Sequence, residues 1–275
     1  STTVSLFSTV IQSTGCRGKN GRKKGGIKAH MVVRAKDNLP CIVKLTPGKA
    51  SDVKFIHNLD LPAGSIVVMD KAYRNYNQYN QWNNEQVTWV TRLHGRSVFT
   101  LVENNPLEIK QHLAGVKEDW TVELGHSQDK NRFKARMIVF FDAVNKQELR
   151  FITNNFELDA LTIAEIYRQR WQIELLFKRI KQNFQLHFFL GDNENAIQIQ
   201  LWSTLIADLL IKIIKDKAAR LQKAKRWSMA NLAGLIRLHL ATYIDLLHFL
   251  INPDKALLNY KNPHPQIQLS FFPSQ

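Results

Sequence analysis

The segment from residue 167 to residue 181 constrains the fold of this chain more than any other stretch. It has no glycine or proline and lies within a longer helical pattern, so we expect one helix over residues 161–183. Successive helical residues are rotated by ~100°, so five polar side chains should share a stripe about 80° wide. These five are Tyr167, Arg170, Glu174, Lys178 and Lys181. The apolar packing face would come from Ile173, Leu176, Phe177 and Ile180.

This polar stripe has two interpretations. In the first it is a solvated surface, where Arg170–Glu174 and Glu174–Lys178 pairs stabilise the helix by only ~0.3 kcal/mol each. In the second it is a polyanion site, where a metal-binding carboxylate is flanked by cations that bind phosphate. The helix alone is compatible with both, so the choice depends on the rest of the chain.

The charge balance indicates the kind of partner. The 275 residues, enough for a sizeable core in one or two domains, include 38 Lys and Arg against 23 Asp and Glu, a net charge of +15. This excess favours nucleic acid ahead of an anionic membrane. Cys16 and Cys41 show no zinc spacing or disulfide framework and suit a reducing cytoplasm. The apolar run at residues 232–251 contains Arg237 and Asp245, so we interpret it as a buried helix and expect no membrane partner.

The first part of the chain reads as strands. We expect strands over residues 2–7, 27–34 and 39–45, with the last two joined as a hairpin through residues 36–38. The glycine-rich basic run at residues 15–26 is predicted to be a loop, serving either as a solvated turn or as a phosphate contact. A short helix is expected over residues 49–58, with Ser51 as a candidate N-cap.

The run Ser65-Ile66-Val67-Val68-Met69 is continuously apolar, which is typical of a central strand buried on both faces. Asp70 follows at its carboxyl end, the edge where open α/β sheets bind ligands. A polar and aromatic helix is expected over residues 73–84. Asp70 is therefore a candidate site residue on a different element from Glu174.

The remaining pattern divides the chain. We predict a core with its first part at residues 1–85, a β-rich insertion at 86–155, a helical second part of the core at 156–251 and a mostly irregular tail at 252–275. Expected strands in the insertion are residues 87–93, 97–102, 120–124, 135–141 and 149–153. Apolar helices are expected at 195–215 and 228–250, with a basic connecting segment at 212–226. The predicted fold class is α/β.

Two carboxylates on separate elements, Asp70 and Glu174, can share one divalent cation, and Mg²⁺ or Mn²⁺ prefers such oxygen ligands. Phosphodiester cleavage with two such ions usually needs a third carboxylate, which we expect on the first strand. No acidic residue lies between Ser1 and Lys36, so the best position is the residue just before Ser1. The other candidates, Asp37, Asp52 and Asp60, occupy positions typical of turn or capping residues.

The spacing Y-(2)-R-(3)-E-(6)-K is kept in full by Tyr167, Arg170, Glu174 and Lys181. With this signature the chain resembles the catalytic domain of bacterial insertion-sequence transposases of the DDE class, in the insertion-sequence-4 group. Asp70-Lys71-Ala72-Tyr73 resembles the Asp-x-x-Tyr that follows the second acidic strand of the group, and Ser1-Thr2-Thr3 resembles the stretch after its first catalytic Asp. The resemblance covers nearly the whole chain.

The resemblance implies an RNase H-like mixed sheet flanked by helices, with a β-rich insertion before the Glu-bearing helix. It implies that Asp70 and Glu174 are catalytic metal ligands for Mg²⁺ or Mn²⁺. Four residues would hold DNA phosphates: Tyr167, Arg170, Lys178 and Lys181. Some relatives stack a flipped base on an insertion-domain Trp, and Trp89 and Trp120 lie in that region, although a Trp on a strand is more often core. Trp171 is expected to pack the helix.

The expected function is therefore metal-dependent cleavage and strand transfer of insertion-sequence ends. The expected partners are double-stranded DNA, both transposon ends and target, and a second copy of the chain in a synaptic complex within the bacterial cytoplasm, at the nucleoid. Two alternatives stay open: a catalytically inactive DNA-binding protein descended from a transposase, and a host nuclease of RNase H-like fold. An Asp encoded immediately before Ser1 would favour the enzyme over the inactive binder.

Overall fold

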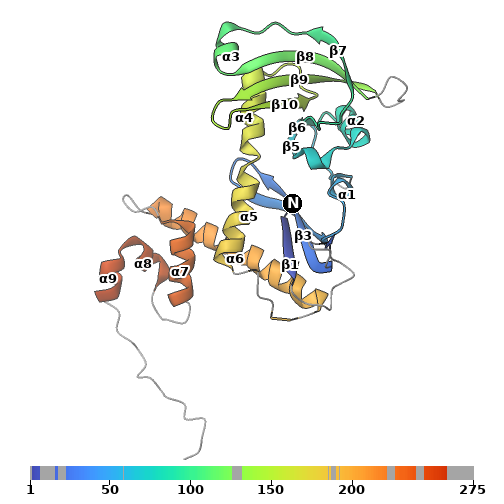
Figure 1. Ribbon diagram of the computed structural model, residues 1–275. Coiled ribbons are helices and arrows are strands. Elements are labelled where there is room, and N and C mark those ends of the chain that lie inside the picture. The colour runs from blue at the N-terminus through green and yellow to red at the C-terminus, as the bar shows by residue number, and fades with distance from the viewer. Residues whose placement is uncertain are drawn as a thin grey trace, which may run out of the picture. The chain divides into compact units, whose positions relative to one another are not determined.

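The computed structural model describes residues 2–6, 16–17, 23–57, 59–125, 132–184, 186, 190–191, 193–221, 227–239 and 245–258. The chain forms two compact units, Ser1–Phe177 and Lys178–Gln275 (Figure 1). The predicted division at residues 85, 155 and 251 remains a prediction, and each unit is described separately below.

The first sheet of the first unit is built around one long strand. Strand β3 pairs antiparallel with its three neighbours. The strands are β1 (Thr2–Leu6), β2 (Cys16–Arg17), β3 (Lys23–Arg34) and β4 (Leu39–Pro47). Asn38 closes the β3–β4 turn at φ +54°, a left-handed conformation that Asn tolerates well. The predicted hairpin is therefore confirmed.

The glycine-rich run is less of a loop than we predicted. Strand β3 begins at Lys23, and Gly25 and Gly26 pair with Leu6 and Ser5 of β1. Glycine has a low propensity for strands, but here the ladder with β1 provides hydrogen-bond partners for the backbone of both glycines, so the strand forms. A Cβ on Gly48 would lie 2.9 Å from the Gly26 carbonyl oxygen, so this close crossing excludes larger residues at Gly48. Residues 18–22 of the run lie outside the described residues.

The second sheet is mixed and has six strands in the order β5-β6-β10-β9-β8-β7. Only the β5–β6 pair is parallel, among the strands that the structure describes. The strands are β5 (Ile66–Val68), β6 (Thr88–Arg92), β7 (Phe99–Asn104), β8 (Val116–Leu124), β9 (Phe133–Asp142) and β10 (Gln147–Thr153). A mixed sheet flanked by helices agrees with the predicted RNase H-like fold.

Strand β5 corrects one expectation. We predicted a central strand buried on both faces, but β5 lies at an edge of the six-stranded sheet and Ile66 is 49% exposed. A continuous apolar run does not distinguish a central strand from an edge strand, because the neighbouring strand is supplied by distant sequence. The five strands predicted between residues 86 and 155 are all present and extend the sheet that contains β5.

Helices cover this sheet on both faces. Helix α2 (Tyr76–Asn84) packs on β6, where Tyr79, Trp82 and Trp89 are fully buried. Helix α4 (Ala160–Gln169) crosses β6, β8, β9 and β10 (Figure 1). Its core residues Ala160, Ile163 and Tyr167 cluster with Val90, Ile138 and Phe151 of the sheet. Alternating side chains along β6 thus serve two separate cores.

Several local predictions need correction. The helix at residues 73–84 begins later, because a short 3₁₀ turn (Lys71–Tyr73) precedes α2. Helix α1 (Val53–Ile56) is capped at Asp52 rather than Ser51, without a side-chain capping bond. Helix α3 (Ile109–Leu113) was not predicted; its start is a capping box between Glu108 and Gln111, with Glu in place of the usual Ser or Thr.

The second unit is helical. It contains the end of α5 (Gln172–Asn183), α6 (Glu194–Leu221), α7 (Met229–His239), α8 (Leu246–Ile251) and α9 (Pro253–Leu258). Two predictions were wrong here: the basic segment after residue 212 continues α6 to Leu221, and the helix expected at 228–250 is two helices. The tail, expected to be mostly irregular, begins with α9. Pro253 suits the first position of a helix, where its missing N–H is not needed. Residues 222–226, 240–244 and 259–275 lie outside the described part.

Helix α6 is long and apolar enough to cross a membrane, judged by length and composition alone. It nevertheless contains a buried carboxylate, Asp208, which accepts hydrogen bonds from Arg179 at 3.0 and 2.6 Å. Such a bidentate pair is the usual way in which a folded protein accommodates a buried charge. The same helix contributes Ile211 and Ala218 to a core shared with α7, α8 and α9.

His30 on β3 makes the stability of the first unit depend on pH. Its fully buried ring stacks on Phe55 at 4.9 Å and lies 2.9 Å from the Thr46 hydroxyl. Burial lowers the pKa of His30 to about 4, despite the opposing charge of Asp52. In the unfolded chain the imidazole of His30 binds a proton near pH 6.5, whereas in the folded chain it does so only near pH 4. The free energy of unfolding therefore decreases as the pH falls from 6.5 toward 4. The loss amounts to about 3 kcal/mol.

We therefore expect His30→Gln to flatten the fall in unfolding free energy between pH 6.5 and pH 4. The measurement is urea unfolding at a series of pH values, compared with His112→Gln, which removes an exposed histidine from α3. The comparison separates His30 from carboxylates that titrate in the same range. Equal pH dependence in the two variants would show that His30 does not resist protonation.

Candidate active site

The polar stripe lies on two helices rather than one. Helix α4 ends at Gln169 and α5 begins at Gln172. Between them the Arg170 and Trp171 amides donate to the carbonyls of Tyr167 and Arg168, three residues back, both at 3.1 Å. This tighter turn changes the rotation per residue, so the stripe is not that of one continuous α-helix. Trp171 is 58% exposed there, which corrects the expectation that it packs the helix.

Asp70 lies directly after β5, as predicted. The last residue pair in the ladder between β5 and β6 is Val68 opposite Val90. One more hydrogen bond follows it, in which the Met69 amide donates to the Val90 carbonyl at 3.1 Å. Asp70 then caps the 3₁₀ turn, and its Oδ1 accepts the Ala72 amide at 3.0 Å. One carboxylate oxygen is thereby oriented by the backbone, on an element that is anchored to the sheet.

Tyr167, Arg170 and Glu174 form one group. The Tyr167 ring is 93% buried, packs on Phe151 at 4.8 Å, and has the Arg170 guanidinium 5.5 Å from its centre. Arg170 Nη1 donates to Glu174 Oε1 across one helical turn. The side chain of Arg170 is mostly buried, with 16% exposed, so this pair is better shielded from solvent than an ordinary surface pair.

The charges of this group act on one another and on Asp70. Burial raises the pKa of Tyr167, an effect that Asp70 reinforces and Arg170 opposes, so the phenol stays neutral at physiological pH. Burial disfavours the charged form of Arg170, but the hydrogen bond to Glu174 and the nearby Asp70 outweigh it and raise the pKa of the guanidinium. Both carboxylates therefore lie within electrostatic reach of one guanidinium.

Three polar atoms of the group are buried without a hydrogen-bond partner: the Tyr167 hydroxyl, Arg170 Nε and Glu174 Oε2. The Tyr167 hydroxyl is close enough to Arg170 to be influenced by its charge, yet it makes no hydrogen bond of normal geometry. Unsatisfied buried polar atoms are costly and are expected where a ligand supplies the missing partners. Two potential donors and one acceptor side by side suit a phosphate accompanied by a cation.

Asp70 and Glu174 supply the hard oxygen donors that Mg²⁺ or Mn²⁺ prefers. A free Glu174 Oε2 fits this role, since Mg²⁺ is often held by one or two carboxylates plus substrate phosphate oxygens. Among the described residues no group of three acidic, His or Cys side chains comes together. The residues present therefore fit one ion, and a second ion would need a further ligand.

The alternative acidic candidates have other roles. Asp37 pairs with Arg34 in the β3–β4 turn, at 2.7 Å. Asp52 lies 3.4 Å from the Lys28 ammonium, and Asp60 is exposed before the turn that leads to β5.

Trp89 is fully buried against Tyr79, so it belongs to the core and offers no face to a flipped base. Trp120 is partly buried against the same core.

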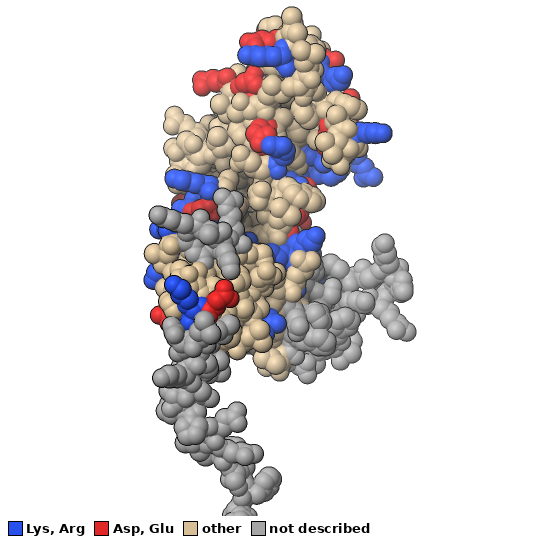
Figure 2. Space-filling view, turned by 90° about the vertical axis from the view of Figure 1, so that its left-hand side faces the viewer, with Lys and Arg blue, Asp and Glu red and all other residues tan. Residues whose placement is uncertain are grey.

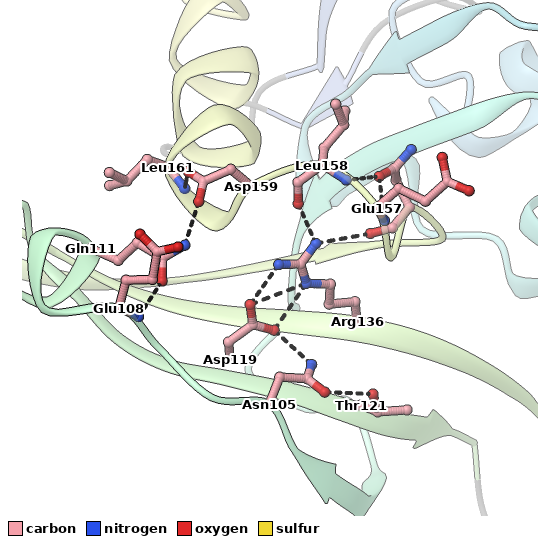
Figure 3. Close-up of polar contacts among 11 residues, drawn as sticks. Asn105, Glu108, Gln111, Asp119, Thr121, Arg136, Glu157, Leu158, Asp159 and Leu161 are labelled. Atoms are coloured by element: carbon pink, nitrogen blue, oxygen red, sulfur yellow. Dashed lines mark hydrogen bonds and ion pairs between the residues drawn. The ribbon is translucent and has the colours of Figure 1, made fainter.

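The start of α4 is fixed by a buried polar network. Arg136 of β9 donates from Nε and Nη2 to Asp119 of β8, at 2.9 and 2.6 Å. Its remaining nitrogen, Nη1, donates to the carbonyls of Asn155 and Leu158, in the loop that leads into α4 (Figure 3). Asp159 then caps α4 by accepting the Leu161 amide at 2.9 Å. The network ties the helix that carries Tyr167 to the sheet that positions Asp70.

Comparison with known protein families decides the class. A family model described as "Transposase DDE domain" matches residues 1–210, which is more than half of the chain. The chain belongs to the transposase DDE domain family. The matched residues include both candidate carboxylates, Asp70 shortly after β5 and Glu174 on α5.

Three relatives of this transposase domain are named as transposases, and two of the names specify an insertion-sequence element. "Putative transposase y4zB" of Sinorhizobium fredii is 28% identical over 205 residues, 74% of this chain and 56% of the relative. "Probable transposase for insertion sequence element IS5377" of Geobacillus stearothermophilus is 29% identical, over 72% of this chain and 52% of the relative. "Putative transposase for insertion sequence element IS4SA" of Synechocystis is 27% identical, over 68% and 53%. The chain thus spans about half the length of these relatives.

Charge on the transposase domain is not gathered into one patch on the face shown in Figure 2. Lys and Arg side chains there are separated by uncharged surface and interleaved with Asp and Glu. Lys178 and Lys181 are both exposed on α5, beyond the boundary of the first unit. For the site, the local arrangement around Arg170 is therefore more informative than the total charge of +15.

Sequence reasoning missed the Arg136–Asp119 pair and Arg92, whose charge opposes the effect of burial on the Tyr167 pKa. A signal for the first was present, because Arg136 interrupts the otherwise apolar run at residues 135–141. A buried charge of this kind needs a partner, but sequence alone does not identify it. Arg92 gave no such signal, because it ends β6 in a place where an exposed basic residue is ordinary.

Proposed function

We propose that this chain is the catalytic part of a DNA transposase, which cleaves the ends of an insertion sequence and joins them to target DNA with a divalent metal ion. The observation that carries the proposal is the partly buried group of Tyr167, Arg170 and Glu174, which has three unsatisfied polar atoms. The charge of Asp70 acts on its guanidinium. Membership of the transposase DDE domain family supports it.

In this proposal Asp70 and Glu174 hold Mg²⁺ or Mn²⁺. A bound ion of this kind polarises a phosphoryl oxygen and activates water, or later a DNA 3′-hydroxyl, as the nucleophile. Arg170 orients Glu174 through Nη1 and presents its unsatisfied Nε to the phosphate. The buried phenol of Tyr167 offers a neutral donor beside it, since its raised pKa keeps the proton in place.

The wider binding roles follow from the same proposal. Lys178 and Lys181 act as point charges for phosphates of the transposon end, and the partner is double-stranded DNA, both element ends and target. Two copies of the protein hold two ends in a synaptic complex. The chain acts in the bacterial cytoplasm at the nucleoid. The proposal also includes the predicted domain division, in which a β-rich insertion at residues 86–155 separates the two parts of the core.

One observation favours a second candidate, an inactive DNA-binding protein descended from a transposase. Among the described residues there is no group of three acidic, His or Cys side chains that could hold a metal ion. A protein that binds element ends without a complete metal site would keep the phosphate-binding cations and lose cleavage.

The test is nicking of a labelled duplex that carries the element's own ends by the full-length protein that the gene encodes. We expect cleavage with Mg²⁺ or Mn²⁺ and none in EDTA, because the proposed chemistry requires the ion. A duplex of equal length with scrambled ends is the control. Binding of the ends without any cleavage would favour the inactive binder, and cleavage that persists in EDTA would exclude the metal mechanism.

A further inference from the structure

Helix α6 carries a second apolar stripe, on the side of the helix opposite its buried face. The buried face includes Ile197, Leu201 and Ile211. At ~100° of rotation per residue, the outer stripe lies about 180° around the helix from these residues. It consists of five large apolar side chains, each 41–59% exposed: Ile199, Trp202, Ile206, Leu210 and Ile213. A helix that is apolar on opposite sides is normally buried on both, so the outer stripe indicates a partner that covers it.

The spacing of the outer stripe is that of a contact between two helices. Its residues follow one another at intervals of three, four, four and three positions. This spacing keeps the five side chains within about 80° of one another over a length of ~21 Å. Alternating intervals of three and four are characteristic of residues that pack against a neighbouring helix. The stripe therefore favours another helix over a flat surface or a small ligand.

The stripe is also symmetric about Ile206. Trp202 and Leu210 lie four residues on either side of it, and Ile199 and Ile213 lie seven residues on either side. Two antiparallel copies of α6, related by a two-fold axis at Ile206, would pair Trp202 of each copy with Leu210 of the other. Ile199 would pair with Ile213 in the same way. An interface with two-fold symmetry has to be self-complementary, and this stripe meets that requirement.

The charges at the two ends of α6 favour the antiparallel direction. Glu194 lies in the first turn, whereas Lys217 and Arg220 lie near the other end, and all three residues are exposed. Antiparallel pairing brings the acidic end of each copy beside the basic end of the other, and it also places opposite ends of the two helix dipoles together. Parallel pairing would place the two basic ends side by side, where they repel.

We propose that α6 is a self-association helix, which pairs antiparallel with α6 of a second copy of this chain through the outer stripe. The pairing requires neither DNA nor a metal ion, so it goes beyond the proposed function. It also supplies a contact surface for the two copies of the proposed synaptic complex, and to that extent it rests on the proposed function.

The test is the oligomeric state of the full-length protein without DNA, measured by sedimentation over a range of protein concentrations. We expect the wild type to dimerise. Ile206→Glu and Ile206→Lys should each raise the dissociation constant of the dimer about 30-fold, because residue 206 faces its own copy and each variant brings like charges together. An equal mixture of the two variants should recover the dimer. Ile109→Glu, the same change at an exposed position of α3, is the control and should dimerise like the wild type.

Cysteine variants test the direction of pairing, in a background where Cys16 and Cys41 are replaced by Ser. Ile199→Cys mixed with Ile213→Cys should form a disulfide between copies on oxidation, whereas Ile199→Cys alone should not, because only antiparallel pairing brings positions 199 and 213 together. A disulfide in Ile199→Cys alone would exclude the antiparallel pair. A monomeric wild type, or failure of the mixed charge variants to dimerise, would exclude pairing through α6.

Cleavage of the element's ends is measured on the same wild-type preparation. A protein that dimerises through α6 but never cleaves would retain the self-association helix and refute the proposed catalytic function. Cleavage by a protein that stays monomeric without DNA would refute the self-association helix alone.

Discussion

Replacing Glu174 with Gln is expected to lower metal-dependent cleavage of the element's ends about 1,000-fold. The Gln side chain has the same shape and can still accept from Arg170 Nη1, so the helix junction is kept. What it lacks is the negative charge needed to hold the cation, and a metal ion contributes several kcal/mol to transition-state stabilisation. The measurement is single-turnover nicking in Mg²⁺, with DNA binding in EDTA as a parallel readout.

Glu165→Gln provides the matched control for this substitution. Glu165 is an exposed residue of α4 that pairs with Arg168 at 2.7 Å, one of the ordinary surface pairs of this region. The control should cleave at the wild-type rate, because a surface pair contributes little. Undiminished cleavage by Glu174→Gln would remove Glu174 from the mechanism, whereas a parallel loss of binding would show a defect in the DNA complex rather than in chemistry.

Replacing Arg136 with Met is expected to give the largest loss of stability. Arg136 and Asp119 are 7% and 2% exposed, so removing the cation leaves a buried carboxylate without its partner. Breaking a buried pair in this way costs about 3–5 kcal/mol. For a unit of this size the melting temperature should fall by about 10 °C. Thermal unfolding followed by circular dichroism measures the change.

Two further variants separate the causes of this loss. Arg150→Met removes an exposed arginine of the same sheet and should shift the melting temperature by no more than about 1 °C. The double variant Arg136→Met with Asp119→Leu should recover part of the stability, because it removes both charges together. Recovery should be incomplete, since the carbonyls of Asn155 and Leu158 still lack a donor. A double variant less stable than Arg136→Met would contradict the unpaired charge as the cause.

Much of the candidate site was predictable because it depends on local patterns. The apolar run before Asp70 predicted a strand, and the spacing of Tyr167, Arg170 and Glu174 predicted a helical group, both of which the structure contains. The interruption between α4 and α5 was not predictable, because it has no glycine or proline signal and involves hydrogen bonds only one residue shorter than those of an α-helix. The roles of Lys178 and Lys181 remain predictions.

What the sequence could not supply is the pairing of distant segments. Strand β5 looked central, but β6 is its one neighbour among the described strands, and the far side of β6 is taken by β10, about 60 residues further along the chain. The β5–β6 ladder, when continued, brings Arg92 beside Asp70, although nothing near Arg92 in sequence indicates this neighbour. Three properties therefore depend on the tertiary fold. They are whether a strand is buried on both faces, which residue pairs with a buried charge, and which residues lie next to the end of a strand.

The position of β5 has a consequence for how the protein would lose its activity on heating or in denaturant. Among the strands that the structure describes, only β6 forms a ladder with its three residues, and Asp70 follows two residues after β5 ends. Short edge strands open in local fluctuations that require less free energy than unfolding of the whole unit. Asp70 would then leave the site while the buried sheet around Trp89 and Ile138 stays folded. Tight binding of metal and DNA at Asp70 would in turn close this edge, so the substrate itself would complete the folding of the active site.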